Sequence, residues 1–408
     1  MKILIINYYF EPFVGAHAYR WSQIAKVWAA AGHNVTVIAG RVDDVRCEVR
    51  DGVTVERIGF VRRQNNAKHS LNTISPGKLS RARLTTISLL KKVNRFFFWP
   101  DGLWHWLPFL LISLFKRRHA QYDLMISYSP TFSAHLGGLI YKRFNKFISR
   151  WVVDYGDPFS VSISMPPNNL KLYKFLNFYF ERKVIEYANK VVFTNAKTLE
   201  RYEDFFGMAS CARATVIPHA VDISAFFQGE RSVARQPFNL VYVGAFHRGI
   251  REPYFMVEFF NELSKRFDIT VNVYGALNGV PPSALNVGCV RYHGVVSRQQ
   301  AVEVIRGADI LINIENSNCV MTPSKIVEYV ATGLPIVNFY EKERTELLCH
   351  EGLKERVLHI KNLASLDAIC KFIPKAVLAS ASLSEVKDIL SVYELNNVAE
   401  AYLGGNCG

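Results

Sequence analysis

The sequence alternates short β-branched runs with helical patterns, and this alternation restricts the fold more than any other feature. Such a pattern is typical of α/β proteins, in which helices cover a parallel sheet. A helical pattern over Ala18–Ala31 follows the first apolar run, and Gly32 is placed to cap its C-terminus. The strands expected in the first half are Ile3–Asn7, Val35–Ala39, Leu124–Ser127, Arg150–Asp154 and Lys190–Thr194.

The same pattern restarts in the second half. The strands expected there are Asn239–Val243, Ile269–Tyr274, Val290–His293, Ile310–Ile314 and Ile336–Asn338. Two Rossmann-like halves with parallel sheets predict a central cleft in which a ligand binds. The stretch between them contains Pro218 and lacks sustained periodicity. The predicted organisation is an N-terminal domain over 1–205, a linker over 206–237, a C-terminal domain over 238–382, and a helical segment over 383–408 that packs back towards the first domain.

Composition indicates a globular protein with an anionic partner. Of the 408 residues, 50% are hydrophobic and 21% are charged, which argues against widespread disorder. The formal net charge of +14 is compatible with acidic lipid, phosphorylated substrates or nucleic acid. The sequence contains no recognisable nucleic-acid-binding module, so nucleic acid is not favoured.

The cysteines and the N-terminus indicate a cytoplasmic protein. Seven scattered cysteines without a CxxC pair or a Cys/His cluster predict buried thiols in a reducing compartment, not disulfides or a zinc site. The apolar run that follows Lys2 is four residues long, too short for the core of a signal peptide.

An aromatic segment over 96–115 has two interpretations. Two prolines, Asp101 and His105 interrupt it, and its apolar tail is about half of the ~20 residues that a spanning helix needs. It is either a buried helix with basic ends or an aromatic ledge that docks on an anionic bilayer. The preceding stretch, Arg62–Arg83, is basic and is expected to be a loop. The cations that flank the aromatic segment are Lys91, Lys92, Arg95, Lys116, Arg117 and Arg118.

Glycine follows the first strand of each half. Gly15 precedes the helix that carries Arg20, where a helix N-terminus can present amides to a phosphate. A plain turn is the alternative for Gly15. The fingerprint GxGxxG is absent, which disfavours NAD or FAD. In the second half, Gly244 is followed by His247, Arg248 and Arg251. These arginines form either a solvated basic loop or a diphosphate site, because guanidinium groups bind phosphates through charge-assisted bonds.

The run Met321–Val337 combines a helix start with a charged pair. Thr322 or Ser324 can cap a helix whose first amides point at an anion, and Lys325 adds positive charge. Glu328, one turn later, can accept hydrogen bonds from the hydroxyls of a ribose. Taken alone, Glu328 is equally well an ordinary helix glutamate.

The spacing Pro-Ser-Lys-x-x-Glu-Tyr-x-Ala-x-Gly-x-Pro-Ile-Val resembles the donor-site signature of family 4 retaining glycosyltransferases. It is most similar to members that build bacterial surface polysaccharides such as lipopolysaccharide. The stretch Gly32–Val37 and the "IPNGVD"-like Ile217–Asp222 fall in the family order, and the match covers almost the whole chain. The resemblance implies the GT-B fold, a nucleoside-diphosphate-sugar donor, no cofactor and no metal. The donor-binding residues that it implies are Gly15, Gly244, Arg248, Arg251, Val295, Ser324, Lys325 and Glu328.

The sequence departs from the family pattern at three places. Val320 stands where many relatives have a second glutamate, and Ala245 where an arginine is common. These two departures weaken the donor-sugar and phosphate assignments. His219-Ala220 replaces Asn-Gly between the domains.

The resemblance implies retention by front-face attack, with the leaving phosphate assisting deprotonation of the acceptor. Asp157 is the candidate catalytic residue that orients acceptor or sugar, and a turn residue before Pro158 is its alternative. Further residues on the acceptor or phosphate side are Arg20, His17 and His247.

The leading hypothesis is a hexosyltransferase, peripheral on the inner face of the cell membrane, that extends a lipid-linked or oligosaccharide acceptor. The alternatives are a nucleotide-sugar epimerase on the same architecture and a non-catalytic subunit that binds nucleotide sugar in an assembly complex.

Overall fold

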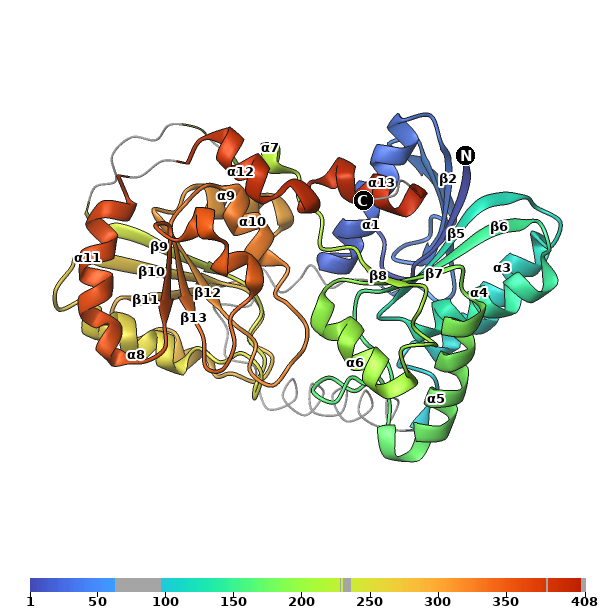
Figure 1. Cartoon of the computed structure of the whole chain (residues 1–408), viewed down its shortest axis with the longest axis horizontal. Coiled ribbons are helices and arrows are strands. Elements are labelled where there is room, and N and C mark those ends of the chain that lie inside the picture. The colour runs from blue at the N-terminus through green and yellow to red at the C-terminus, as the bar shows by residue number, and fades with distance from the viewer. Residues whose placement is uncertain (63–96, 228, 230–235, 379–380, 405–408) are drawn as a thin grey trace. The chain divides into compact units, whose positions relative to one another are not determined.

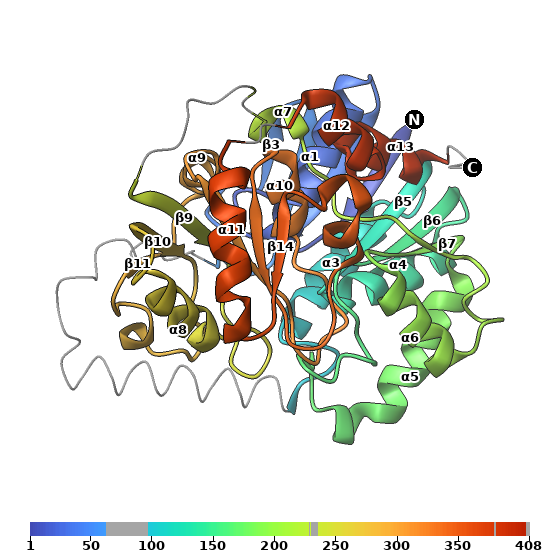
Figure 2. The ribbon, with the colours of Figure 1, turned by 60° about the vertical axis from the view of Figure 1, so that its left-hand side comes forward.

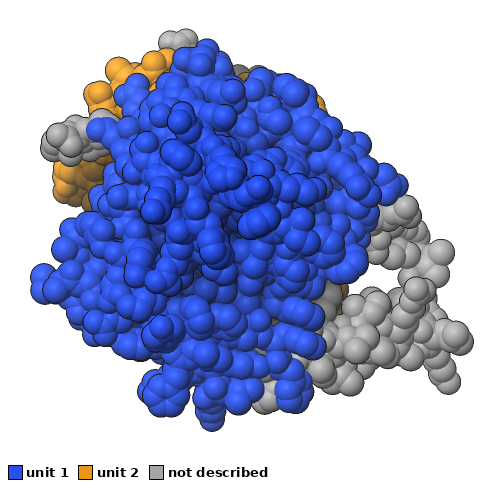
Figure 3. All heavy atoms as spheres, turned by 90° about the vertical axis from the view of Figure 1, so that its right-hand side faces the viewer, with its two compact units in different colours: residues 1–218, 398–408 blue, residues 219–397 orange. Residues whose placement is uncertain are grey.

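The computed structural model describes residues 1–62, 97–227, 229, 236–378 and 381–404. It divides into two compact units, Met1–Pro218 with Val398–Gly408, and His219–Asn397. Figure 3 colours the first unit blue and the second orange. The loop predicted over Arg62–Arg83 lies outside the described residues, apart from Arg62 itself.

The first unit is built on an eight-stranded sheet among its described residues, in the order β3-β4-β2-β1-β5-β6-β7-β8 (Figure 1). The edge strand β3 is antiparallel to β4, and the remaining pairs are parallel. The strands are β1 Lys2–Ile6, β2 Asn34–Gly40, β3 Cys47–Arg50, β4 Val53–Ile58, β5 Tyr122–Ser129, β6 Ile148–Tyr155, β7 Lys190–Phe193 and β8 Ala214–Val216.

Helices cover this sheet, and polar caps mark where several of them begin. Asn169 accepts hydrogen bonds from two backbone amides of α5, and Asn195 accepts one from the Thr198 amide of α6. Gly32 follows α1 with a φ of 84°, as its predicted role in ending that helix requires. The helices are α1 Ala16–Ala30, α3 Leu107–Lys116, α4 Phe132–Phe144, α5 Leu170–Tyr187, α6 Ala196–Phe206 and α13 Leu395–Leu403, with a 3-10 turn η2 at Trp104–Trp106.

Helix α3 packs one face into the core of the first unit. Trp106, Leu110 and Leu114 are buried, and a Cβ at Gly137 of α4 would lie 2.3 Å from the Leu110 side chain. The absence of a side chain at Gly137 therefore allows α3 and α4 to approach closely. This part of the aromatic segment is thus a helix with one face buried in the core, whereas Ile112 and Phe115 on its other face are exposed; docking of the segment on a bilayer stays a prediction.

The second unit holds a six-stranded parallel sheet in the order β11-β10-β9-β12-β13-β14, among its described residues. Its strands are β9 Phe238–Val243, β10 Ile269–Tyr274, β11 Val290–Gly294, β12 Ile310–Ile314, β13 Ile336–Phe339 and β14 Val357–Ile360. Its helices are α7 Ile223–Phe226, α8 Tyr254–Leu263, α9 Arg298–Arg306, α10 Lys325–Ala331, α11 Leu366–Ala376 and α12 Leu383–Ile389. Short 3-10 turns lie at Pro282–Ala284, Glu346–Cys349, Glu351–Leu353, Leu363–Ser365 and Ser391–Tyr393.

The stretch expected to be a linker, 206–237, contains structured elements of both units. Strand β8 belongs to the first sheet, and Phe226 of α7 is buried in the second unit. The division between units falls between Pro218 and His219. Strand β8 has only three residues, too few to show a periodicity, and for this reason it was not predicted. The C-terminal segment is likewise divided, because α12 belongs to the second unit and α13, from Val398 onward, to the first.

The cysteine prediction was wrong in one respect. Of the six cysteines in the described part of the chain, Cys211 is buried, whereas Cys47 and Cys349 are exposed. A 3-10 turn at the surface and an edge strand tolerate this small side chain without burying it. Within the described residues, no helix has the length and apolar character needed to cross a membrane.

Candidate functional site

Each sheet has a point where the strand order reverses. Strand β1 lies between β2 and β5 in the first sheet, and β9 lies between β10 and β12 in the second. At such a point the loops that follow adjacent strands diverge to opposite faces and leave a crevice at the carboxyl ends of the strands, where α/β proteins bind ligands. Each unit therefore has one candidate binding edge.

In the first unit, this edge brings together His17 and Asp157. His17 lies in the first turn of α1, and Asp157 follows β6. Nδ1 of His17 is 2.8 Å from the hydroxyl of Tyr128 on β5, and Nε2 is 3.3 Å from the carboxylate of Asp157. Gly15, directly before α1, has a φ of 153°, which residues with side chains rarely adopt, and a Cβ there would meet nothing within 4 Å. The backbone at Gly15 thus requires glycine and borders open space.

The charge state of His17 depends on Asp157. Burial lowers the pKa of His17, but attraction and hydrogen bonding to the Asp157 carboxylate, with a further attraction to Asp154, outweigh burial and raise the pKa above 6.5. Both side chains are partly exposed. A partly exposed imidazole and carboxylate can together hold a ligand hydroxyl and exchange a proton with it.

Arg20, predicted to lie on the acceptor or phosphate side, takes part in a separate buried network. Its guanidinium donates to the carbonyls of Ile217 and Pro218 and to the hydroxyl of Tyr402, at 3.1, 2.5 and 2.6 Å. The Tyr402 hydroxyl donates in turn to the Asp154 carboxylate at 2.7 Å, and Nε of Arg20 is 3.7 Å from the same oxygen. Burial raises the pKa of Asp154, and the charge of Arg20 opposes that rise. This network fastens α13 to the first unit.

In the second unit, the loop after β9 holds its two arginines differently. Arg248 is exposed, whereas Arg251 donates to the side-chain carbonyl of Asn316, after β12, at 2.7 Å. A turn around Gly249 separates the two arginines. The backbone amide of His247 donates to the carbonyl of Arg251, and the amide of Arg251 donates to the carbonyl of His247, which closes the turn. Burial, and then the charge of Arg251, lower the pKa of His247.

Gly244, at the end of β9, has a packing reason to be glycine. A Cβ there would lie 2.9 Å from the hydroxyl of Tyr242. Val295, which follows β11, is exposed.

Helix α10 presents a carboxylate held between two cations. Lys325 and Arg298 donate to the two oxygens of Glu328, at 2.6 and 2.7 Å. Ser324 occupies the N-cap position as predicted, but its side chain makes no capping hydrogen bond. Burial lowers the pKa of Lys325, against the opposing attraction of Glu328. The Glu328 carboxylate is therefore pre-oriented by its neighbours.

Two residues that position this group were missed by sequence reasoning. The hydroxyl of Tyr329 accepts from the amide and donates to the carbonyl of Val243, at 2.8 and 3.1 Å, which fixes α10 against the end of β9. Arg298 is the first residue of α9 and lies between Ser297 and Gln300, which form the capping box of that helix. That Ser-x-x-Gln pattern could have located the helix start, although not the partner of Arg298.

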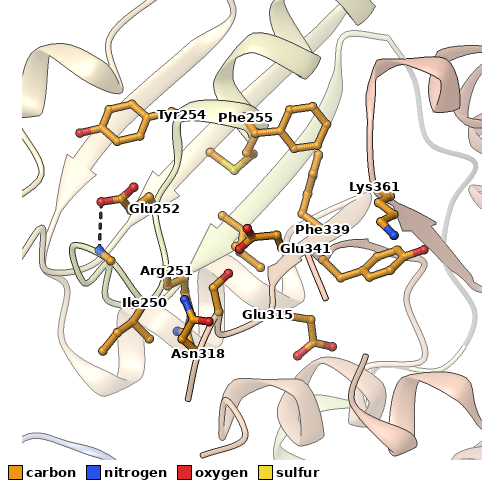
Figure 4. A pocket seen from close by; sticks show the side chains of 15 residues that line it. Ile250, Arg251, Glu252, Tyr254, Phe255, Glu315, Asn318, Phe339, Glu341 and Lys361 are labelled. Carbon is orange, nitrogen blue, oxygen red and sulfur yellow. Dashed lines mark hydrogen bonds between the residues drawn. The ribbon is translucent and has the colours of Figure 1, made fainter. Parts of the chain in front are cut away.

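A cavity of about 470 Å³ opens beside this edge of the second sheet. It is lined by residues that follow β9, β12, β13 and β14, and Figure 4 shows Arg251 and Lys361 well apart across it. The Glu315 carboxylate in its wall accepts hydrogen bonds from the amide and hydroxyl of Thr345, both at 2.8 Å. Among the predicted donor residues, Arg251 lines this cavity, whereas Ser324, Lys325 and Glu328 lie outside its lining. The described residues contain no group of three His, Cys, Asp or Glu side chains arranged to hold a metal ion.

Comparisons with known proteins agree with this architecture. The model of the family described as Glycosyltransferase Family 4 matches residues 18–225. No curated protein matches the chain. Among solved structures, Anabaena Alr3699/HepE in complex with UDP and glucose is similar with a TM-score of 0.61 and 15% identity, over 99% of this chain and 98% of that one.

Two further glycosyl-transfer proteins have similar folds. Sucrose-phosphate synthase from Thermosynechococcus elongatus has a TM-score of 0.60 and 14% identity, over 98% of this chain and 96% of that one. WaaG, a glycosyltransferase involved in lipopolysaccharide biosynthesis, has a TM-score of 0.59 and 13% identity, over 99% of this chain and all (100%) of WaaG. At these identities the likeness shows the fold, which is GT-B.

Proposed function

This chain belongs to Glycosyltransferase Family 4, and from this premise we propose that it transfers a hexose from a nucleoside-diphosphate sugar to a lipid-linked glycan, with retention of configuration. The observation that carries the proposal is the Glu328 carboxylate, held by Lys325 and Arg298 on a helix that Tyr329 fastens to the end of β9. A fixed carboxylate at the carboxyl edge of a Rossmann-like sheet is suited to bind the ribose of a nucleotide.

The donor diphosphate is assigned to the loop after β9. Arg251 is held by Asn316, and the exposed Arg248 is available to the same ligand. Guanidinium groups neutralise the charge that develops on a departing diphosphate, and we assign this role to them without a metal ion. HepE, which shares the fold, forms a complex with UDP and glucose, and this supports a nucleotide donor for the present chain.

The acceptor is assigned to the first unit. The His17–Asp157 pair orients the acceptor hydroxyl, and the leaving phosphate takes its proton during front-face attack. The role of WaaG in lipopolysaccharide biosynthesis supports a surface-polysaccharide product. Because the proposed acceptor is linked to a lipid, we assign the protein to the inner face of the cell membrane.

A donor panel tests the proposal. The full chain is melted with each of a set of nucleotide sugars and nucleoside diphosphates, because a ligand that binds the native state raises the melting temperature. We expect one nucleoside diphosphate and its sugar to stabilise the protein. Transfer is then measured to a polyprenyl-diphosphate-linked sugar and to a free oligosaccharide, with and without EDTA.

Three outcomes would overturn parts of the proposal. Conversion of the donor without an acceptor would indicate an epimerase, and donor binding without turnover would indicate a non-catalytic subunit. Loss of transfer in EDTA would contradict the assignment of the diphosphate charge to arginines alone.

A further inference from the structure

We propose that the outer face of α5, with the cavity at its N-terminal end, is the surface by which this protein docks on an anionic lipid bilayer. The α5 face comprises Leu172, Phe175, Leu176 and Tyr179, together with Lys171 and Lys174. This proposal rests on the proposed function, because an enzyme that acts on a lipid-linked acceptor must reach a membrane surface.

The α5 face is an apolar stripe turned towards solvent. Leu172, Phe175, Leu176 and Tyr179 follow the i, i+3, i+4, i+7 spacing of one helix face, and they are 56, 84, 43 and 56% exposed. Surface helices of globular proteins place such a stripe against the core. An exposed contiguous apolar patch of this kind marks a site of interaction.

Buried polar residues on the opposite side fix the rotation of α5. Asn177 exchanges hydrogen bonds with Asn168 and accepts one from the Trp99 indole. Glu181 accepts from the Ser160 amide and the Tyr202 hydroxyl, at 3.0 and 2.7 Å. Turning the apolar stripe inward would break these bonds and leave buried polar groups unsatisfied, so the fold itself holds the stripe outward.

Neighbouring segments extend the same apolar surface. Ile163 and Met165, in the loop before α5, are 70 and 42% exposed. Phe97 is also exposed, and its carbonyl accepts a hydrogen bond from Tyr173 of α5 at 2.5 Å. Figures 1 and 2 both show α5 at the lower end of the first unit, away from the sheet.

The charges around the α5 face select an anionic partner. From Leu170 to Phe180 the helix carries two lysines and no acidic residue. A cavity of about 500 Å³ lies between α5 and α6, and its charged lining residues are Lys171, Lys174, Arg201 and Asp204. Apolar walls with a net positive rim fit a phospholipid, whose phosphate can enter the cavity while the exposed aromatic and aliphatic side chains enter the interface. A second copy of this chain would bring like charges together.

The chain topology joins this surface to the candidate acceptor site. The loop that follows β6 contains Asp157 near its start and ends at Asn169, the cap of α5, so the N-terminal end of α5 and Asp157 lie at the same edge of the sheet. A second exposed group consists of Phe144, the last residue of α4, and Lys146, which lies between α4 and β6, and so this group is at the opposite edge. It offers matched control positions in the same unit.

Vesicle co-sedimentation of the full chain tests the proposal. The vesicles are phosphatidylcholine alone or mixed with phosphatidylglycerol, at low and at high salt. The α5 variants are Phe175→Ser with Leu176→Ser, and Lys171→Glu with Lys174→Glu; the controls are Phe144→Ser and Lys146→Glu. All these side chains are exposed, and the melting temperature of each variant checks that it is folded.

We expect the unaltered protein to sediment with anionic vesicles at low salt and to be released at high salt. Each α5 double variant should lower partitioning by about ten-fold or more, and each control by less than about two-fold. Equal binding of the α5 variants and the unaltered protein would overturn the proposal, as would an equal loss in the controls. Sedimentation without vesicles would also overturn it, in favour of self-association.

Thermal stabilisation by nucleotide sugars, measured on the same variants, separates this inference from the proposed function. Vesicle binding that depends on α5, with no response to any donor, would refute the donor assignment and support the docking surface. A donor response with no vesicle binding would refute the docking surface alone.

Discussion

Nε2 of His17 lies 3.3 Å from the carboxylate of Asp157, which joins the first turn of α1 to the loop after β6. This pair raises the pKa of His17 against the opposing effect of burial. Asp157→Asn should therefore lower the pKa of His17, as measured by following the imidazole resonances with pH. The exposed carboxylate of Asp204 provides the control Asp204→Asn, which should leave the pKa of His17 unchanged.

The same pair makes stability depend on pH in a defined direction. A histidine whose folded-state pKa is raised contributes stability that is present below its unfolded pKa, about 6.5, and lost as pH rises through the folded pKa. Denaturant unfolding should thus show Asp157→Asn to be most destabilising near about pH 5.5 and nearly neutral near about pH 9. An equal loss at both pH values would mean that the protonated pair does not stabilise the fold.

Tyr402→Phe should destabilise the first unit. The lost hydroxyl accepts from Arg20 and donates to Asp154, and both charged groups are buried. We expect the free energy of unfolding to fall by about 1–3 kcal/mol, the cost of leaving buried polar groups unsatisfied. Urea denaturation measures this loss, and Tyr179→Phe on the exposed face of α5 serves as the control. A fall of the same size in the control would mean that the hydrogen bonds of Tyr402 to Arg20 and Asp154 are not the cause of the lost stability.

Arg251→Ala should weaken binding of a nucleoside diphosphate more than Arg248→Ala does. Arg251 is already held by Asn316 and lines the cavity, so less side-chain freedom is lost when it binds a phosphate. The loss of one charge-assisted bond corresponds to about ten-fold or more in Kd. Calorimetry on both variants and on the exposed control Lys265→Ala gives the ranking. The reverse order would reassign the diphosphate to Arg248.

The sequence identifies strands that are buried on both faces better than strands at the sheet edges. The continuous apolar runs of β1 and β12 are readily recognised, because parallel strands covered by helices on both sides need apolar residues throughout. Strands β3 and β8 are short and lie at the two edges of the first sheet, partly exposed, so their sequences show no such run. These two strands are recognised only in the structure, where β3 pairs with β4 and β8 pairs with β7.

Contacts within one helix could be predicted, whereas contacts across the fold could not. Lys325 and Glu328 are one turn apart, so their pairing follows from helical spacing. Arg20 pointed to an anionic ligand because it follows a glycine loop, but its partners Tyr402 and Asp154 come from distant parts of the chain. Arg20 and Tyr402 are 382 residues apart in the sequence, and only the folded unit shows that the Tyr402 hydroxyl lies 2.6 Å from the Arg20 guanidinium. His17 and Tyr128, 111 residues apart, illustrate the same limit.

The most direct test of the donor site is calorimetric titration of Glu328→Ala with the nucleoside diphosphate that stabilises the unaltered protein. Removing a carboxylate that binds the ribose hydroxyls should cost about 1–3 kcal/mol, which is roughly a 5- to 150-fold increase in Kd. Glu303→Ala, an exposed glutamate on α9, should leave Kd unchanged. An unchanged Kd in Glu328→Ala would contradict the account, because the carboxylate held by Lys325 and Arg298 would then have no part in binding the donor.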